Sequence, residues 1–287
     1  MKGIILAGGT GSRLWPLTKT TSKQLLPVYD KPLIYYPLST LMLAGIKEIL
    51  IITTPQDSDD FKNLLGDGKS LGISIEYAVQ PKPEGLAQAF IIAEEFIGDD
   101  SVALILGDNI FYGSGLGRRL SEIPNVPGAT IFGVRVNDPQ RYGVVEISEN
   151  GQIKSIEEKP TNPKSNIAVP GLYFFDQTVS ERAKMVTKSA RGELEITSVI
   201  DSYLKNNLLS IRELEENTAW MDCGTVDSMN DASNFIRQVE QSSGKKIGCI
   251  EEIAWHYNWI DNEALISISN YYGNNEYGRY IRNLLGD

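Results

Sequence analysis

The sequence opens on Lys2-Gly-Ile-Ile-Leu-Ala-Gly-Gly-Thr-Gly-Ser-Arg-Leu-Trp-Pro-Leu-Thr18, and this stretch predicts a buried strand followed by a phosphate-binding loop. The apolar run before the first glycines of the loop is typical of a strand covered on both faces. Glycines directly after such a strand let backbone N–H groups turn toward a phosphate, and the basic side chains of Arg13 and Lys23 follow. The loop glycines are Gly8, Gly9 and Gly11. Together these features predict a site for a nucleoside triphosphate.

Two common phosphate-binding motifs do not account for this loop. A P-loop requires Gly-Lys-Ser/Thr after four intervening residues, which the stretch lacks. The dinucleotide fingerprint G-x-G-x-x-G begins at Gly9 and Gly11, but Leu14 stands in place of its third glycine. A tight turn without a ligand explains the glycines alone equally well. The two cations and the Leu26-Pro27 pair favour the nucleotide.

Composition limits the class of protein. The chain has 287 residues, a net charge of −10 and a pI of about 4.8, whereas nucleic-acid-binding domains are usually basic; we therefore expect a small-molecule ligand. No apolar run approaches the ~20 residues of a membrane span, and no secretory leader is expected after Met1. Cys223 and Cys249 are too few for a disulfide framework, so we expect a reducing, cytoplasmic location.

Short apolar runs alternate with amphipathic stretches over the first half of the chain. This alternation predicts an α/β fold with a doubly wound, mostly parallel sheet in one large domain. The expected strands are Lys2–Ala7, Glu48–Thr53, Ser74–Val79, Val102–Leu106 and Thr130–Val134. The expected helices are about Pro32–Ala44, Asp57–Leu65, Leu86–Phe96 and Leu116–Ser121. Ligands of such sheets bind beyond the carboxyl ends of the strands, where Gly8, Gln80 and Asp108 fall.

The second half begins with further strands and ends in helices. Tyr142–Glu149 and Gln152–Glu157 flank Asn150-Gly151, the strongest short signal for a hairpin. Another strand is expected over Ile167–Phe175. We expect these strands to form a β-rich insertion that lies as a lid over the edge of the sheet. From Val226 onward the pattern is helical.

Two aspartates are candidates for metal binding. Asp108 follows an apolar run and a glycine, and Asp222 follows a second short apolar segment. Mg²⁺ is usually held by one or two carboxylates together with phosphate oxygens and waters. Each aspartate could equally cap a turn or the start of a helix, so this pattern leaves both interpretations open.

The N-terminal stretch resembles the signature of the sugar-phosphate nucleotidyltransferases, G-G-x-G-[ST]-R-L-x-P-x-T followed by K-x-x-L-P. The matching residues are Gly8, Gly9, Gly11, Ser12, Arg13, Leu14, Pro16, Thr18, Lys23, Leu26 and Pro27. The resemblance runs from residue 2 to the end of the chain, through Leu106-Gly-Asp-Asn109, Glu157-Glu-Lys-Pro160 and Trp220-Met-Asp-Cys-Gly-Thr225. It implies a Rossmann-like nucleotidyltransferase fold with a sugar-binding insertion, and it is strongest to members that join dTTP to glucose 1-phosphate.

The resemblance also implies roles for individual residues, with Asp108 and Asp222 as the Mg²⁺ ligands. The implied catalytic residues are Arg13, Lys23, Asp108, Lys159 and Asp222. The implied nucleotide-binding residues are Gly8, Gly9, Gly11, Ser12, Arg13, Lys23, Gln24, Gln80, Gly85 and Asp108. The implied sugar-phosphate-binding residues are Asn109, Tyr142, Gly143, Glu158, Lys159, Val169, Arg191 and Trp220.

The expected reaction needs no side-chain nucleophile. An oxygen of the sugar phosphate is already anionic, and it can attack the α-phosphorus of the nucleotide in line and expel pyrophosphate. Positioning and charge neutralisation then supply the catalysis. This expectation fits a sequence whose single histidine, His256, lies far from every motif.

The resemblance further implies a homotetramer and feedback inhibition by a dTDP-sugar at a second site. Tyr112, Gly113 and the Cys249–His256 segment are the candidates for that site, and plain packing of the C-terminal helices is the alternative. The expected parts of the single domain are 1–135 for the nucleotide, 136–225 for the sugar phosphate and 226–287 for assembly and regulation.

Two other functions stay open on the sequence. A uridylyltransferase, or an enzyme for another sugar 1-phosphate, differs from the first hypothesis by only a few contacts to the ribose or the sugar. A non-catalytic nucleotide sensor is the second alternative. Loss of Arg13, Lys23 or a candidate metal ligand would have favoured the sensor, and all are present.

Overall fold

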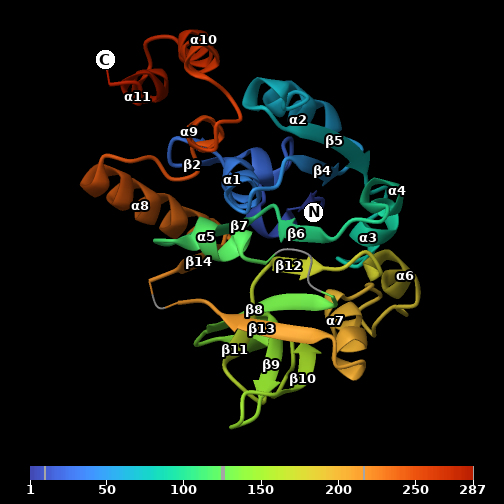
Figure 1. The fold of residues 1–287 in the computed structure, drawn as a ribbon. Coiled ribbons are helices and arrows are strands. Elements are labelled where there is room, and N and C mark those ends of the chain that lie inside the picture. The colour runs from blue at the N-terminus through green and yellow to red at the C-terminus, as the bar shows by residue number, and fades with distance from the viewer. Residues whose placement is uncertain (10, 124–126, 216, 287) are drawn as a thin grey trace.

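The computed structural model describes residues 1–9, 11–123, 127–215 and 217–286, and its centre is a ten-stranded sheet (Figure 1). The strands lie in the order β10-β9-β11-β8-β12-β6-β1-β4-β5, and β13 also pairs with β8. The strand bounds are β1 (Lys2–Ala7), β4 (Glu48–Thr53), β5 (Ser74–Val79), β6 (Val102–Leu106), β8 (Ala129–Arg135), β9 (Gly143–Ile147), β10 (Ile153–Glu158), β11 (Ile167–Val169), β12 (Leu172–Phe175) and β13 (Leu209–Glu213).

The N-terminal half of the sheet is parallel, as the sequence predicts. β1 lies between β4 and β6, and β5 pairs with β4, all in the parallel sense. The predicted strands are confirmed: the bounds of β1, β4, β5 and β6 agree, and β8 is longer by one residue at each end. The carboxyl ends of β1 and β6 therefore lie side by side at one edge, where ligands bind in open α/β sheets.

Helices cover both faces of this parallel half (Figure 1). The bounds of the α-helices of the molecule are α1 (Tyr35–Leu43), α2 (Ser58–Leu65), α3 (Gln88–Ile92), α4 (Glu94–Ile97), α5 (Leu116–Ser121), α6 (Val179–Lys184), α7 (Ile196–Lys205), α8 (Val226–Ser243), α9 (Ile250–His256), α10 (Asn262–Tyr272) and α11 (Glu276–Asn283). Since successive strand residues point to opposite faces, Ile5 packs in one core cluster with Leu41 and Phe61, and Ile4 packs in another with Phe90. The doubly wound prediction is thus confirmed.

The predicted hairpin forms, but the insertion is not a lid over the sheet edge. β9 and β10 pair antiparallel, and β11 pairs with both β8 and β9. These strands therefore continue the main sheet, and the lid prediction is wrong. The carboxyl end of β8 explains the difference, because Val134 and Arg135 pair with β11, and β11 in turn pairs with β9 in the same sheet.

Two predicted elements are each divided. The strand expected over Ile167–Phe175 is two strands, β11 and β12, because Pro170 has no N–H and Gly171 donates its N–H to the side chain of Asn109 at 3.0 Å. The expected helix Leu86–Phe96 is likewise two short helices, α3 and α4.

Two small sheets and the C-terminal helices complete the fold. β7 (Asn109–Tyr112) pairs antiparallel with β14 (Ala219–Asp222), and β2 (Pro27–Val28) pairs with β3 (Lys31–Pro32). Neither pair was predicted. In Figure 1 the red helices α9 to α11 lie on the side of α1 and away from β8 to β10. Across the described ranges, every helix is too short or too polar to cross a membrane.

Candidate functional site

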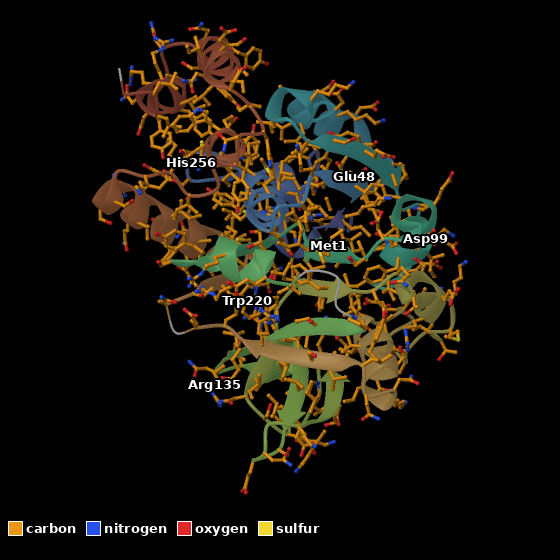
Figure 2. All side chains as sticks on the ribbon, in the orientation of Figure 1. Met1, Glu48, Asp99, Arg135, Trp220 and His256 are labelled. Carbon is orange, nitrogen blue, oxygen red and sulfur yellow. The ribbon has the colours of Figure 1, made fainter. Side chains whose placement is uncertain are left out.

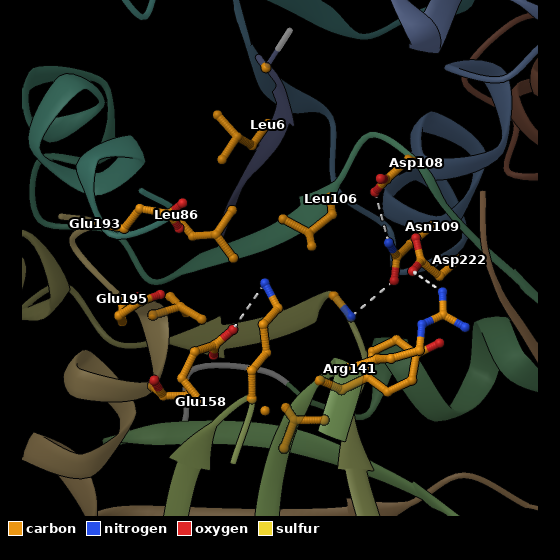
Figure 3. A pocket seen from close by; sticks show the side chains of 18 of the residues that line it. Leu6, Leu86, Leu106, Asp108, Asn109, Arg141, Glu158, Glu193, Glu195 and Asp222 are labelled. Carbon is orange, nitrogen blue, oxygen red and sulfur yellow. Dashed lines mark hydrogen bonds and ion pairs between the residues drawn. The ribbon is translucent and has the colours of Figure 1, made fainter. Parts of the chain in front are cut away.

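A cavity of about 700 Å³ lies between the carboxyl ends of β1 and β6 and the strands β9 to β12 (Figure 3). It brings together fifteen of the residues that the sequence analysis assigns to the site. They are Gly8, Gly9, Arg13, Lys23, Gln24, Asp108, Asn109, Tyr142, Gly143, Glu158, Lys159, Val169, Arg191, Trp220 and Asp222. Residues from the N-terminal loop and from position 222 thus meet at one place, although they lie far apart in the chain.

Four assigned residues are not on the wall of this cavity. Gly11 has a φ of 58° and precedes the 3₁₀ turn that contains the exposed Ser12. Gln80 lies next to Gly8, since a Cβ on Gly8 would be 2.5 Å from Oε1 of Gln80. Gly85 lies against the backbone of Leu194. Of these four residues, Gln80 contacts the wall through Gly8, and Gly11 and Ser12 belong to the loop that carries Arg13.

The pairing of β7 with β14 places Asp108 next to Asp222. Asn109 is the register partner of Asp222, and the N–H of Cys223 donates to the carbonyl of Asp108 at 2.9 Å. Asn109 is buried and fixes this corner, since its Nδ2 donates to Asp108 Oδ1 at 2.9 Å and its Oδ1 accepts the indole N–H of Trp220 at 2.7 Å. Figure 3 shows the two aspartates on the same side of the cavity.

Three cations surround the two aspartates. The ammonium of Lys23 forms an ion pair with Oδ2 of Asp108. Nη2 of Arg141 lies 3.8 Å from Oδ2 of Asp222. Arg13 is also near Asp222, because a Cβ on the intervening Gly224 would lie 3.1 Å from both Arg13 Nη2 and Asp222 Oδ1.

The two carboxylates differ in their affinity for protons. Burial opposes the charge on Asp108, but the Lys23 ammonium outweighs it and holds the pKa of Asp108 below its ordinary value. Burial, followed by the neighbouring Asp108 charge, raises the pKa of Asp222. A further positive charge next to Asp222 would therefore stabilise the charged form of this carboxylate.

This donor set fits a hard divalent cation that brings other ligands with it. Two carboxylates and phosphate oxygens are the usual Mg²⁺ environment. In the part of the chain that the structure describes, no group of three or more His, Cys, Asp or Glu side chains could hold a metal. A metal at Asp108 and Asp222 would accordingly need oxygens from a substrate to complete its coordination.

The opposite wall carries the cations assigned to the sugar phosphate. Lys159 has a left-handed backbone (φ 42°) and its N–H donates to the carbonyl of Tyr142 at 3.0 Å. Its Nζ lies 3.6 Å from Glu158 Oε1, and Arg191 Nη1 lies at the same distance from that oxygen. A non-glycine residue in this conformation indicates strain that the surrounding structure maintains, and here it directs Lys159 to the cavity.

Glu158 is the central acid of this wall. Burial raises its pKa; the Lys159 ammonium opposes that effect, and Glu195 adds to it. Gly143 faces Glu158 in the register of β9 and β10 and Val169 in that of β9 and β11. Tyr142 meets Trp220 edge-on, with 5.0 Å between ring centroids. This part of the cavity combines a carboxylate with two aromatic rings, a combination suited to a sugar ring.

Several cavity residues were not predicted. Arg141 lies over the ring of Tyr142 at 5.3 Å and is held by Asp138 at 2.8 Å. Glu193 and Glu195 hold Arg191, at 3.1 and 3.5 Å. The sequence offered one signal for these residues: Arg141 is adjacent to Tyr142, and Glu193 and Glu195 follow closely after Arg191. The unpredicted polar or charged residues are Arg141, Glu193, Glu195 and Thr197.

The candidates for a second site lie outside this cavity. The ring of Tyr112 packs edge-on against Phe235 of α8 at 6.0 Å, and α9 packs on α1. His256 contacts Glu252 at 3.4 Å on the same helix, and Figure 2 shows it well away from Trp220. The single histidine is therefore not part of the cavity.

Comparisons with known proteins agree with this geometry. The model of a family described as nucleotidyl transferase matches residues 2–239. A glucose-1-phosphate thymidylyltransferase of Neisseria meningitidis is 54% identical over 286 residues, 99% of each chain. One of Mycobacterium tuberculosis is 54% identical over 285 residues, again 99% of each chain.

Solved structures give the same result. A Bacillus anthracis protein, described as a glucose-1-phosphate thymidylyltransferase in complex with a sucrose, is similar with a TM-score of 0.76 and 43% identity. The similarity covers 83% of this chain and 95% of that one. A UDP-glucose pyrophosphorylase complexed with UDP-glucose gives a TM-score of 0.74 at 26% identity, covering 83% of this chain and 98% of the other.

Proposed function

This chain belongs to the nucleotidyl transferase family, and from that premise we propose that it is a glucose-1-phosphate thymidylyltransferase. The reaction joins dTTP and glucose 1-phosphate into dTDP-glucose and releases pyrophosphate, and we place it at the start of dTDP-rhamnose and deoxysugar synthesis. The observation that carries the proposal is the position of Asp108 and Asp222, between cations on the nucleotide side and cations on the sugar side.

Enzymes of this family generally use a divalent metal, and we propose Mg²⁺ held by Asp108 and Asp222. When bound, the ion supplies positive charge to the phosphate oxygens of the nucleotide. Lys23 lies against Asp108 and is within reach of the same oxygens. Arg13, at the end of the glycine loop, neutralises the leaving pyrophosphate.

The sugar phosphate binds on the opposite wall. Lys159 and Arg191 hold its phosphate and aim an oxygen at the α-phosphorus of the nucleotide. Glu158 accepts hydroxyl hydrogen bonds from the glucose ring, and Tyr142 and Trp220 cover the apolar part of the ring. Because the attacking oxygen is already charged, no side chain has to remove a proton.

Each of the three parts of the chain has its own function in this proposal. Residues 1–135 bind the nucleotide, with Gln24, Gln80 and Gly85 at the base, and 136–225 bind the sugar phosphate. Residues 226–287 serve assembly, and we propose a homotetramer with a feedback site for a dTDP-sugar formed by Tyr112, Gly113 and Cys249–His256. Both cysteines are buried and unpaired, which supports a cytoplasmic location.

Pyrophosphate release, measured over a matrix of nucleoside triphosphates and sugar 1-phosphates, tests the proposal. The largest kcat/KM is expected for dTTP with glucose 1-phosphate in the presence of Mg²⁺. A largest value for UTP would make the protein a uridylyltransferase, a possibility kept open by the 26% identity to UDP-glucose pyrophosphorylase. If the protein binds nucleotide but releases no pyrophosphate with any pair of substrates, it is a non-catalytic nucleotide sensor.

A further inference from the structure

A chain of hydrogen-bonded polar side chains lies next to Gly8 on the nucleotide side of the cavity. Gln80, only 6% exposed, follows β5 and lies against Gly8, which lines the cavity. Its Nε2 donates to Oε1 of Gln88 at 2.7 Å and lies 3.5 Å from the carbonyl of Gly85. Oε1 is the atom that lies against Gly8. The oxygen of this amide, and not its nitrogen, is therefore the end next to Gly8, a residue of the cavity wall.

Gln88 has only one orientation available to it. Its Oε1 accepts the backbone N–H of Glu84 at 3.2 Å, and its Nε2 donates to Oε2 of Glu84 at 3.1 Å. A backbone N–H can only donate and a carboxylate can only accept. If the Gln88 amide were reversed, it would place a donor against the N–H and an acceptor against the carboxylate.

Lys188 pairs with the Glu84 carboxylate. Its Nζ lies 2.7 Å from Oε1 of Glu84, and this hydrogen bond lowers the pKa of Glu84. Glu84 thus fixes the orientation of the Gln88 amide, and Gln88 fixes the orientation of the Gln80 amide. Within the described residues, no hydrogen bond to Oε1 of Gln80 is present.

An amide oxygen facing the base selects a particular class of nucleobase. It can accept a ring N–H, which thymine and uracil carry at N3. Cytosine has a lone pair at that position, so two acceptors would face each other. An unpaired polar group in a buried contact costs ~1–3 kcal/mol, which is roughly a 5- to 150-fold change in affinity.

From these contacts we propose that Gln88 is a positioning residue that fixes the Gln80 amide with its oxygen toward the base, and so makes the enzyme reject cytosine nucleotides. The inference rests on the proposed function, because it concerns how that site selects its nucleotide. It predicts no distinction between dTTP and UTP, since both carry the N3–H. Gln88 itself does not touch the base.

The test is the ratio of kcat/KM for dTTP to kcat/KM for dCTP, with glucose 1-phosphate as the second substrate. Gln88→Met keeps the size of the side chain and removes both polar atoms, so the Gln80 amide is free to reverse. We expect the ratio to fall about tenfold or more. Gln238→Met, on an exposed position of α8, is the matched control and should leave the ratio unchanged.

A double variant provides rescue. Gln88→Glu with Glu84→Gln exchanges donor and acceptor between these two positions, and a carboxylate at 88 still accepts from Gln80 Nε2. The ratio should return to within about threefold of the wild-type value. If Gln88→Met lowers kcat/KM for both nucleotides equally, the residue is merely structural and the inference is overturned.

Calorimetry with dTTP and dCTP, without sugar phosphate, separates this inference from the proposed function. If the wild type binds dTTP better than dCTP but forms no product, the proposed function fails, while a loss of that preference in Gln88→Met still supports the role of Gln88. If the wild type forms dTDP-glucose and the variant retains the full preference in both assays, the function stands and the inference fails.

Discussion

At the scale of single residues, the site gives different pKa values to two aspartate side chains, Asp108 and Asp222. Asp108 is neutralised by Lys23, whereas Asp222 is buried beside a charge of the same sign and has a raised pKa. Arg13 and Arg141 compensate Asp222 only partly. Of the two aspartates, Asp222 is therefore the one at which an arriving cation gains more and the one whose charge costs the unliganded fold more.

Asp222→Asn should lower kcat by about 100-fold or more, as expected when a charge contact to the reacting phosphates is lost. Stability should change in the other direction. A carboxyl with a raised pKa contributes its full stability below its ordinary pKa and loses it as the pH rises through the raised value. At neutral pH the melting temperature of the variant should thus equal or exceed that of the wild type. Asp227→Asn, an exposed neighbour, is the control, and near-normal turnover of Asp222→Asn would contradict the assignment.

Glu158 should show the same conflict between stability and function. Its pKa is raised by burial, so its contribution to stability is complete below the ordinary value and is lost as the pH rises through the raised value. Glu158→Gln should raise the melting temperature at pH 8 and leave it nearly unchanged near pH 4. Loss of the charged acceptor should also lower kcat/KM for glucose 1-phosphate by about 10- to 100-fold. A lower melting temperature at pH 8 would show that the ion pairs of Glu158 outweigh its burial.

At the scale of elements, the parallel half of the sheet could be predicted and the pairing of short strands could not. β1, β4 and β6 consist mostly of buried apolar residues, the pattern of a strand covered on both faces, while β5, at the end of the strand order, alternates apolar and polar residues over Ser74–Tyr77. β7 and β14 have four residues each, and their pairing joins positions more than a hundred residues apart. Local pattern contains no information on such a contact, although it is the contact that places Asp222 beside Asp108.

The same limit applies to the candidate site. The glycine loop, Arg13 and Lys23 are close in sequence and could be predicted from their spacing. The carboxylates around Arg191 belong to a turn that looks like a solvated charged segment, and only the tertiary contact with Glu158 gives that turn a place in the cavity. The resemblance to a known family, rather than the local pattern, supplied Lys159 and Arg191.

One loop contact links the nucleotide wall to the sugar wall. The N–H of Leu194 donates to the carbonyl of Glu84 at 2.7 Å, and the N–H of Ala87 donates to the carbonyl of Leu194 at 3.0 Å. Gly85, with a φ of 114°, allows this approach, because a Cβ there would lie 2.4 Å from the oxygen of Leu194. The segment before α3 and the segment before α7 are thereby held together.

Gly85→Ala should therefore force these two segments apart. Overpacking of this kind costs ~1–3 kcal/mol of unfolding free energy, measured by urea denaturation, and KM should rise for both substrates. Gly151→Ala is the matched control, since Gly151 also has a positive φ (80°) but nothing lies within 4 Å of the added Cβ. Equal losses of stability in the two variants would attribute the effect to the backbone angle alone and would argue against the link.

At the scale of the whole molecule, a buried group of charges joins the N-terminal half to the C-terminal helices. Lys31 begins β3, Glu240 lies near the end of α8, and Lys246 precedes α9; their side chains are exposed by 8% or less. Lys31 lies 3.2 Å from Glu240, Lys246 lies 3.3 Å from it, and the N–H of Ile247 donates to the same carboxylate at 2.8 Å. One carboxylate thus holds three segments.

Glu240→Ala would leave two buried ammonium groups with Asp30 as their remaining acid among these contacts. Removing one partner from a buried charge group costs ~3–5 kcal/mol, because the desolvated charge that remains is not compensated. We expect a loss of that size in urea denaturation, while Glu149→Ala, at an exposed turn, should stay within about 0.5 kcal/mol of the wild type. Glu240→Gln keeps an acceptor for Ile247 and should fall between the two. If Glu240→Ala unfolds at the same urea concentration as the wild type, α8 and α9 are held to the N-terminal half by their apolar contacts, and the charges are incidental to the integrity of the molecule.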